Sequence, residues 1–404
     1  MKRVLITGAN MENKGAQSML FVAVDELKKR YKDVQVYFAY SSGNFDEEKY
    51  NFKGVYYTGV TKKIALGQNG FYNYMKRSVK DCAKWILGKR TALWKAKELK
   101  TLMSKMDMII DVSGFQLGDK WDITTNQEFL NNIRLAKKYN IPIYLMPQSF
   151  GPFHYKDKSI LKDIEEELKY PEIIFAREIQ GKDMLEKEFG LTNVRLYSDM
   201  VLQNTGIDPK NIYKKDVKLN YTKITGRGNV GIVPNTKCLK HGDQDKIYGL
   251  YMKLMDTILA KGKKIYLFTH SSEDKIMCEY LKNQYKDNDN VVLITEEMTC
   301  LEYDEFVNQL DFQIGSRFHG LVHAFRNDVP CIALGWAVKY DELCKIVGEE
   351  GYSFDINKID ENTDKIIEKV EYLADHYETE KKVIEEHMKI VRNDNCFSYI
   401  TFKN

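Results

Sequence analysis

The sequence predicts an α/β protein in which two Rossmann-like domains face a cleft and a helical tail follows them. At 404 residues, the chain is longer than a single hydrophobic core usually organises. Short, continuously apolar runs alternate with amphipathic runs of helical period, which is typical of parallel sheets covered by helices on both faces. This alternation stops once, over 204–229, where Gly, Asn and Lys are frequent. The interruption divides the pattern into two domains.

The first set of runs predicts an N-terminal domain over 1–205. Its strands are short and apolar, and its helices are longer and polar on one face. The predicted strands are 3–7, 34–39, 108–112, 141–146, 173–176 and 194–197, and the predicted helices are 16–31, 126–139, 158–169 and 180–189.

After a linker over 206–228, a second set of runs predicts a C-terminal domain over 229–348 and a helical tail over 349–404. The tail is strongly charged and helical in period over 360–392. The predicted strands of this domain are 230–233, 264–268, 291–294, 312–314 and 331–334, and its predicted helices are 244–261, 273–285, 301–309 and 321–326.

Composition excludes several classes of protein. The net charge of +3 argues against a general affinity for nucleic acid. Seven scattered cysteines form no C-x-x-C pair, which argues against a disulfide framework and a zinc site and favours a reducing compartment. We find no cluster of metal ligands and no signal for a cofactor. The chain starts with a strand-like run rather than a signal segment, and no apolar run is long enough for a bilayer, so we expect a cytoplasmic protein.

The most informative motif is Gly315-Ser316-Arg317-Phe318-His319-Gly320, between a predicted strand and a predicted helix. Such a turn places backbone N–H groups and the positive end of a helix dipole at one point. Arg317 adds a permanent cation, and His319 adds a group that can give or take a proton near neutral pH. The motif predicts a site that holds an anionic substrate and moves a proton on it. A surface turn with solvated side chains is the alternative.

Other predicted strands also end in polar residues. Asn13 and Gln17 flank the first βα turn, which lacks the G-x-G-x-x-G fingerprint, and Asn13 is equally suited to capping the helix. Asp111 and Asp119 follow the third strand, where either could act as a base for a sugar hydroxyl, although Asp111 could instead form an Asx turn. Gln148 stands in a rigid Pro- and Gly-containing turn that could be purely structural.

Two further strand ends carry charged residues. Arg177 offers a second guanidinium, able to bind carboxylate or phosphate through two hydrogen bonds, unless it is simply solvated at a helix start. Asp199 is expected to shape a turn or to support its neighbours.

Together these motifs resemble the polysaccharide pyruvyl transferase family. The resemblance spans both domains, from the first turn to Gly348, and Ser316-Arg317-Phe318-His319-Gly320 is its most specific part. The chain departs from the family pattern at Ala16, where an acidic residue is common, and at 113–115, where glycines are common. The other matching segments are 13–17, 113–119, 148–152, 176–178, 198–199, 333–336 and 339–340.

The resemblance implies a GT-B-like fold and transfer of a pyruvyl group from phosphoenolpyruvate to a cell-surface polysaccharide precursor, forming a cyclic ketal. The implied roles place Arg177, Arg317, Ser316 and Gly315 on phosphoenolpyruvate and His319 at the chemistry. Asp119 or Asp111 would assist the attacking hydroxyl. Asn13, Gln17 and Gln148 would contact the acceptor sugar. No metal or cofactor is implied.

Two other functions stay open. A glycosyltransferase with a nucleotide-sugar donor would use the same two-domain cleft and bind the nucleotide in the C-terminal domain. A non-catalytic envelope-assembly subunit fits less well, because both Arg317 and His319 are present.

The segment 76–105 combines many Lys and Arg residues with Trp85 and Trp94. Such a composition predicts either a peripheral contact with the inner membrane face, next to a lipid-linked acceptor, or helices that pack on the first domain with solvated lysines.

Overall fold

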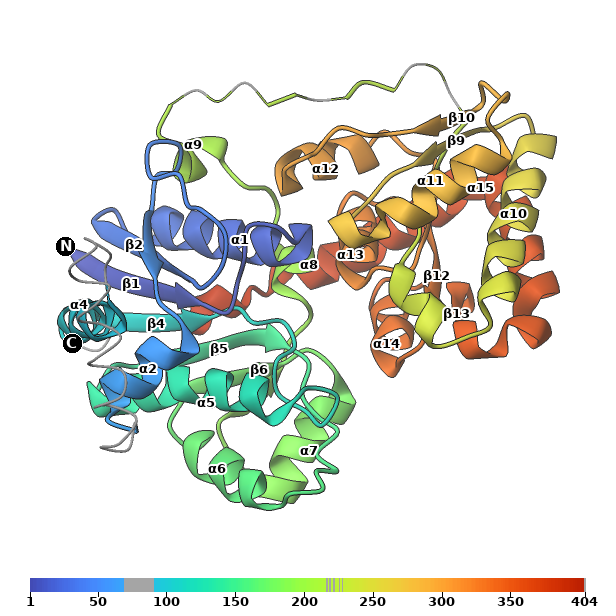
Figure 1. Ribbon diagram of the computed structural model, residues 1–404. Coiled ribbons are helices and arrows are strands. Elements are labelled where there is room, and N and C mark those ends of the chain that lie inside the picture. The colour runs from blue at the N-terminus through green and yellow to red at the C-terminus, as the bar shows by residue number, and fades with distance from the viewer. Residues whose placement is uncertain are drawn as a thin grey trace.

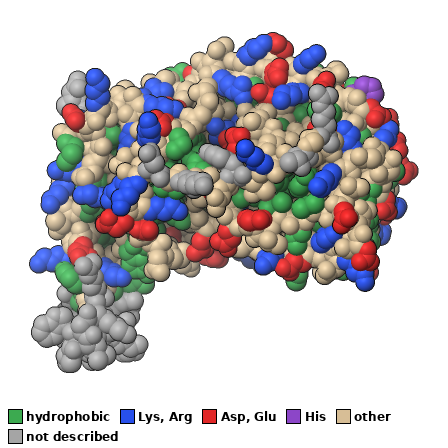
Figure 2. All heavy atoms as spheres, turned by 90° about the horizontal axis from the view of Figure 1, so that it is seen from above, with side chains coloured by type: hydrophobic (Ala, Val, Ile, Leu, Met, Phe, Trp, Pro, Cys, Tyr) green, Lys and Arg blue, Asp and Glu red, His purple; other side chains and the backbone are tan. Residues whose placement is uncertain are grey.

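The protein consists of two α/β domains that lie side by side, each built on a parallel sheet covered by helices, as the computed structural model shows (Figure 1). The structure describes residues 1–68, 91–215, 217, 219, 220, 222–224, 226 and 228–402. On the face seen from above, Lys and Arg side chains are intermixed with Asp and Glu side chains, in keeping with the net charge of +3 (Figure 2).

The first sheet has the strand order β3-β2-β1-β4-β5-β6-β7, and every pair in it is parallel. Its central strands β4 and β5 are buried along their whole length, which explains why they are largely apolar up to the polar residue that ends each of them. The strands are β1 (Lys2–Thr7), β2 (Val34–Tyr40), β3 (Lys53–Tyr56), β4 (Met108–Asp111), β5 (Ile143–Gln148), β6 (Ile173–Ala176) and β7 (Val194–Leu196).

Helices cover both faces of this sheet (Figure 1). The longest, α1, buries its apolar residues against β1 and β2 and begins at a cap formed by Asn13. The helices are α1 (Lys14–Arg30), α2 (Gly59–Leu66), α4 (Ala92–Met103), α5 (Ile123–Lys138), α6 (Ser159–Glu167), α7 (Ile179–Phe189), α8 (Met200–Gln203) and α9 (Pro209–Ile212).

The second sheet has the order β10-β9-β8-β11-β12-β13 and is also parallel. Its strands are β8 (Asn229–Val233), β9 (Lys264–Leu267), β10 (Val291–Leu293), β11 (Phe312–Gly315), β12 (Cys331–Gly335) and β13 (Ser353–Asp355). Its helices are η1 (Thr236–Lys240), α10 (Gln244–Ala260), η2 (Ser272–Asp274), α11 (Lys275–Gln284), α12 (Cys300–Val307), α13 (Phe318–Arg326) and α14 (Val338–Ile346).

The C-terminal segment joins the two domains. After η3 (Glu350–Tyr352), β13 and η4 (Ile356–Lys358), the long helix α15 (Ile359–Asn393) bends at His376 and leads through η5 (Cys396–Tyr399) back to the first domain (Figure 1). There Tyr31 Oη donates to the carbonyl of Ile400 (2.8 Å) and Tyr144 Oη to that of Thr401 (3.0 Å). The predicted tail therefore contributes a strand to one domain and contacts to the other.

The predicted linker also contains structure. Helix α9 lies within it and packs against α1, where Asp25 Oδ1 accepts hydrogen bonds from the Asp208 N–H (3.1 Å) and Asn211 Nδ2 (2.8 Å). The chain crosses to the second sheet only after this contact. The first domain thus holds part of the connecting segment in place.

Candidate active site

Polar loops that follow the strands of both sheets meet where the two domains face each other. Arg177 and Asp199 follow β6 and β7, whereas Arg317 and His319 follow β11. In α/β sheets, ligands bind at the carboxyl ends of the strands, near the point where the strand order reverses. The first sheet reverses between β1 and β4 and the second between β8 and β11. The predicted residues therefore lie at the edge that such sheets use for binding.

The segment from Gly315 to Gly320 forms the predicted turn between a strand and a helix. Strand β11 ends at Gly315, Arg317 occupies the N-cap position, and α13 begins at Phe318 rather than at Leu321. His319 is consequently held by the first turn of a regular helix, which fixes its position more firmly than a loop would.

Gly315 and Ser316 are engaged by the protein itself. The Ser316 hydroxyl forms a hydrogen bond with Tyr251 Oη (2.8 Å). The Ser316 backbone carbonyl accepts hydrogen bonds from Asn235 Nδ2 (3.0 Å) and Tyr340 Oη (3.0 Å). Gly315 pairs with β12 in the sheet. These contacts favour a role in shaping the turn over the direct donor contact that the resemblance implied.

Arg317 is fixed by two carboxylates of the second domain. Its Nε and Nη2 donate to the two oxygens of Asp274 (2.7 and 2.6 Å), and Nη2 also donates to Glu273 (2.5 Å). Asp274 is fully buried at the end of η2. This two-point pair is the strong geometry for a guanidinium and sets the plane in which the remaining N–H groups lie.

Arg177 is fixed in a comparable way by the first domain. Its Nη1 donates to Asp199 (3.0 Å), its Nε to Glu178 (3.0 Å), and its Nη2 to the Ser149 hydroxyl (2.9 Å). The guanidinium carbon stands 4.1 Å from the centre of the Phe318 ring, on the helix that carries His319. The predicted alternative of a solvated arginine is therefore wrong for both guanidinium groups, because both are buried.

Asp199 joins the two domains at this centre. It caps α8 by accepting from the Val201 N–H (2.8 Å), pairs with Arg177, and lies 3.4 Å from His319 Nε2. Burial alone would raise the pKa of Asp199, but the charges of His319 and Arg177 hold it well below its usual range. The turn that we expected at Asp199 is present, and the carboxylate also contacts the candidate catalytic residue.

His319 is packed tightly between the domains. A side chain at Gly15 would place its Cβ 2.5 Å from the His319 ring, so only a glycine at the start of α1 allows this approach. Burial lowers the pKa of His319, Asp199 opposes that shift, and Arg177 adds to it. The proton affinity of this imidazole therefore depends on one carboxylate.

Two further histidines belong to the same centre. The His270 ring lies nearly parallel to that of His319, with centroids 6.4 Å apart, and within the described part of the chain neither of its buried nitrogens has a hydrogen-bond partner. His323 contacts Ser18 Oγ (2.7 Å) in the first domain and Asp304 (2.8 Å) in the second. The sequence analysis missed both, although His270 follows a predicted strand, a signal that marks it as a candidate.

A small cavity of about 130 Å³ is lined by both domains, and its lining includes Ser149 and Glu178, which accept hydrogen bonds from Arg177. Lys339 lines it from α14, and its ammonium group lies 5.4 Å from the centre of the Phe318 ring, which Arg177 also contacts. The pKa of Lys339 is lowered to about 7, chiefly by burial and also by the charges of Arg177, Lys120 and Lys237, while Glu178 opposes the shift. Lys120 and Lys339 thus bring positive charge to the cavity, and Glu178 brings one negative charge.

The three predicted acceptor contacts differ in their surroundings. Asn13 caps α1 through the Ala16 N–H (3.1 Å), as the alternative predicted, and also lines a larger cavity. Gln17 accepts from the Cys300 N–H (2.7 Å) and donates to the Met11 carbonyl (3.2 Å), which favours a role in joining the domains. Gln148 is fully buried, and neither of its side-chain polar atoms has a hydrogen-bond partner among the residues that the structure describes.

The two predicted carboxylate bases lie apart from His319. Asp111 is buried and accepts from Thr7 Oγ1 (2.7 Å) and the Ser113 N–H (3.1 Å), the Asx turn of the alternative, and burial raises its pKa. Asp119 accepts from the His154 N–H (3.0 Å) on a surface loop. Among the described residues, neither carboxylate forms a hydrogen bond with His319, and the predicted role of either as a base for a sugar hydroxyl stays a prediction.

Within the part of the chain that the structure describes, no group of three or more His, Cys, Asp or Glu side chains is arranged to hold a metal ion. In the same part, no helix combines the length and the apolar character needed to cross a bilayer. Of the proposed membrane segment, 76–90 lies outside the described residues. The rest forms α4, where Trp94 is 48% exposed and Leu99 is buried, so the membrane contact stays a prediction.

A model of the polysaccharide pyruvyl transferase family matches residues 13–337. The chain belongs to this family. The match includes both arginines, His319 and the start of α1, and it ends at Ala337, two residues before Lys339. Membership makes the protein a transferase of polysaccharide biosynthesis. No curated protein matches the chain.

Solved structures with the GT-B fold resemble the chain over nearly its whole length. MnaA of S. aureus with UDP is 13% identical, with a TM-score of 0.55 and coverage of 98% of this chain and 92% of that one. Alr3699/HepE of Anabaena with UDP and glucose is 10% identical, with a TM-score of 0.54 and coverage of 97% and 98%. The UDP-GlcNAc 2-epimerase of Methanocaldococcus jannaschii with UDP-GlcNAc and UDP is 14% identical, with a TM-score of 0.51 and coverage of 98% and 100%. The predicted GT-B-like fold is confirmed.

Proposed function

We propose that this protein transfers a pyruvyl group from phosphoenolpyruvate to two hydroxyls of a sugar in a polysaccharide precursor, forming a cyclic ketal. The observation that carries the proposal is the group of cations at the domain junction. Arg177 and Lys339 both lie over the ring of Phe318, the residue next to His319, and Lys339 also lines the small cavity there. A small, doubly anionic donor fits such a site better than a nucleotide-sugar, whose base and ribose need a larger pocket.

Phosphoenolpyruvate carries a carboxylate and a phosphate, and this centre offers cations from both domains. Arg177 comes from the first domain, and Arg317 and Lys339 come from the second. Carboxylates orient both guanidinium groups before the donor arrives, which lowers the cost of ordering them on binding. Donor binding and the contact between the domains therefore depend on the same side chains.

The chemistry requires a proton on the methylene carbon of the donor, because protonation makes the adjacent carbon electrophilic. His319 supplies that proton in the proposed mechanism. A sugar hydroxyl then attacks the electrophilic carbon, loses its own proton, and forms a carbon–oxygen bond. The phosphate leaves with its bonding electron pair, and a second hydroxyl attacks the same carbon, gives its proton to the departing phosphate and closes the ring. One phosphate is released for each ketal formed.

The deciding experiment incubates the protein with phosphoenolpyruvate and a panel of sugar acceptors, and follows phosphate release and the mass of the product. We expect stoichiometric phosphate and an acceptor heavier by one pyruvyl ketal. The alternative is a glycosyltransferase, which the UDP complexes of the GT-B neighbours suggest. UDP binding tighter than phosphoenolpyruvate binding, with transfer from a UDP-sugar, would establish that alternative.

The pKa of Lys339 predicts how donor affinity depends on pH. With a pKa of about 7, the ammonium group is charged below neutral pH and loses its proton above it. We expect phosphoenolpyruvate to bind progressively more weakly between pH 7 and 9, measured by calorimetry. Lys339→Arg should reduce this dependence, because a guanidinium stays charged throughout. An unchanged pH dependence in the variant would remove Lys339 from the donor site.

A further inference from the structure

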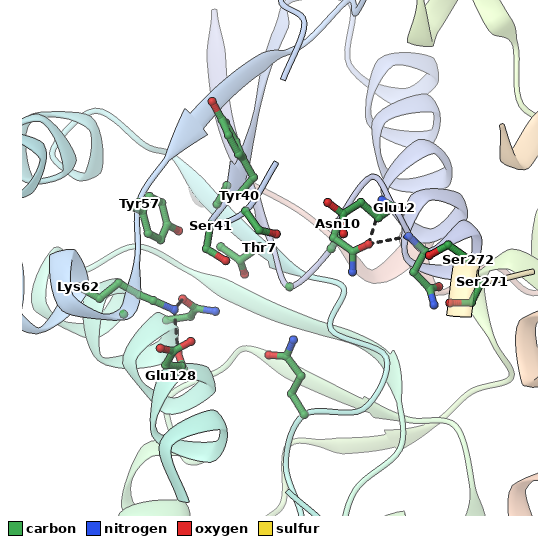
Figure 3. A pocket seen from close by; sticks show the side chains of 18 residues that line it. Thr7, Asn10, Glu12, Tyr40, Ser41, Tyr57, Lys62, Glu128, Ser271 and Ser272 are labelled. Carbon is green, nitrogen blue, oxygen red and sulfur yellow. Dashed lines mark hydrogen bonds between the residues drawn. The ribbon is translucent and has the colours of Figure 1, made fainter. Parts of the chain in front are cut away.

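A second cavity, of about 360 Å³, lies at the strand reversal of the first sheet (Figure 3). Its walls come from the carboxyl ends of β1 and β2, from α2 and α5, and from the second domain at Ser271 and Ser272. Polar side chains and two tyrosines, Tyr40 and Tyr57, make up most of its lining. The candidate catalytic residues do not line it, so its function requires a separate argument.

One end of this cavity adjoins the charged centre. Ser272 lies two residues before Asp274, which holds Arg317. Asn13 lies two residues before Gly15, which packs against the His319 ring. The other end is formed by Lys62, Tyr57 and Glu128, which Figure 3 shows on the opposite side of the cavity from Ser271 and Ser272.

Lys62 is the unusual residue of the remote end. Its side chain is buried, and its ammonium donates to the Glu128 carbonyl (3.0 Å) and to Asn132 Oδ1 (2.9 Å), both uncharged acceptors. No ion pair between described residues involves it, but its ammonium lies 5.9 Å from the centre of the Tyr57 ring. Burial lowers its pKa to about 8, against the charges of Glu128 and Asp111, which raise it, so the ammonium is charged at neutral pH. A buried ammonium that makes two hydrogen bonds gains from a further acceptor on a ligand.

The Glu128 carboxylate complements Lys62. A side chain at Gly59, the first residue of α2, would place its Cβ 2.0 Å from Glu128 Oε1, so glycine leaves space for this carboxylate. Among the described residues, the Glu128 backbone carbonyl accepts a hydrogen bond from Lys62, whereas no hydrogen bond involves the Glu128 carboxylate. The carboxylate can therefore accept a hydrogen bond from a ligand. A donor, an acceptor and tyrosine rings side by side match the hydroxyls and the apolar face of a sugar ring.

We propose that this remote end binds a neutral pyranose that is linked to the sugar receiving the pyruvyl group. The acceptor would then be at least a disaccharide, with its reacting hydroxyls toward His319 and its second ring at Lys62 and Glu128. Because the charges of Lys62 and Glu128 cancel, a neutral ring is favoured over a uronate or a sugar phosphate. The inference rests on the proposed function for the identity of the reaction, but not for the binding of the saccharide.

The kinetic test compares Lys62→Met and Glu128→Gln with the neighbouring control Lys63→Met. Losing a hydrogen bond to a charged group should raise KM for a disaccharide acceptor about tenfold or more. We expect kcat, and KM for phosphoenolpyruvate, to change little. Thermal denaturation would show whether Lys62→Met is stably folded. If it is not, Glu128→Gln, which preserves the size of the side chain, still tests the proposal. Equal effects in the Lys63→Met control, or equal use of monosaccharides and disaccharides by the wild type, would overturn the proposal.

A binding test does not depend on pyruvyl transfer. Saturation-transfer NMR, without phosphoenolpyruvate, would screen neutral and uronate-containing mono- and disaccharides against the wild-type protein. We expect at least one neutral disaccharide to receive saturation on both rings, and Lys62→Met to lose the signal of one ring. If a saccharide binds in this test but forms no ketal in the assay with phosphoenolpyruvate, the proposed reaction is refuted and the saccharide site stands. Absence of any saccharide binding, or preference for uronates, would refute the site.

Discussion

His319→Gln is expected to abolish ketal formation while leaving the protein folded and able to bind phosphoenolpyruvate. Glutamine approximates the size of the imidazole and can donate to Asp199, which lies 3.4 Å from His319 Nε2, but it has no proton to deliver at neutral pH. Removing a general acid costs roughly 10²–10⁴ in rate. Single-turnover phosphate release would measure the chemical step, and calorimetry would measure donor binding.

The matched control is His376→Gln, a substitution of the exposed histidine at the bend of α15. It should leave activity and thermal stability unchanged. If His319→Gln keeps its rate within about tenfold of the wild type, equivalent to ~1.4 kcal/mol of barrier, another group supplies the proton. The buried His270, whose ring lies beside that of His319, would be the next candidate.

The fold was predictable because its central strands are buried on both faces and are therefore largely apolar. Strand β3 has exposed residues at both ends and lies at the edge of its sheet, so it has no comparable pattern and the sequence analysis missed it. The course of the tail was also missed. The hydrogen bond of Tyr144 to Thr401 joins residues 257 positions apart, and no local pattern indicates such a contact.

The candidate site likewise contains residues that were predictable from the sequence and residues that were not. Arg177, Arg317 and His319 follow predicted strands, and that position identified them. Their partners were not predicted, because each depends on tertiary structure. Asp274 holds Arg317 across 43 positions, and the approach of Gly15 to His319 joins the two domains. A polar residue at a strand end is therefore readable from sequence, but its partner is not.

Asp199 is both a strand-end residue that the sequence reveals and a tertiary partner that it does not reveal. Its substitution is expected to have the second large effect on activity. A turn at this residue was predictable, because Asp is a good helix cap. Its contact with His319 was not, since the two belong to different domains. The carboxylate raises the pKa of His319 against the effect of burial, and it pairs with Arg177. Removing its charge should therefore lower the pKa of His319 and leave fewer molecules with the proton that the reaction needs.

Asp199→Asn is expected to lower kcat at neutral pH by roughly 10–100-fold, since one nearby opposite charge shifts a pKa by about 1–3 units. The amide still caps α8 and keeps the size of the side chain, so the loss is mainly electrostatic. The alkaline limb of the profile reports the change, because a lower pKa of His319 moves the fall in kcat toward lower pH. Part of the activity should return on acidification.

The control for this experiment is Asp208→Asn, which replaces another aspartate that caps a four-residue helix, α9, through the Lys210 N–H (3.0 Å). Asp208 is exposed and does not line the charged centre, so this variant should match the wild type at every pH. A purely structural role of Asp199 would lower the amount of folded enzyme but leave the shape of the pH profile of kcat unchanged. A profile of unaltered shape would therefore contradict the assignment of Asp199 as the residue that positions and tunes His319.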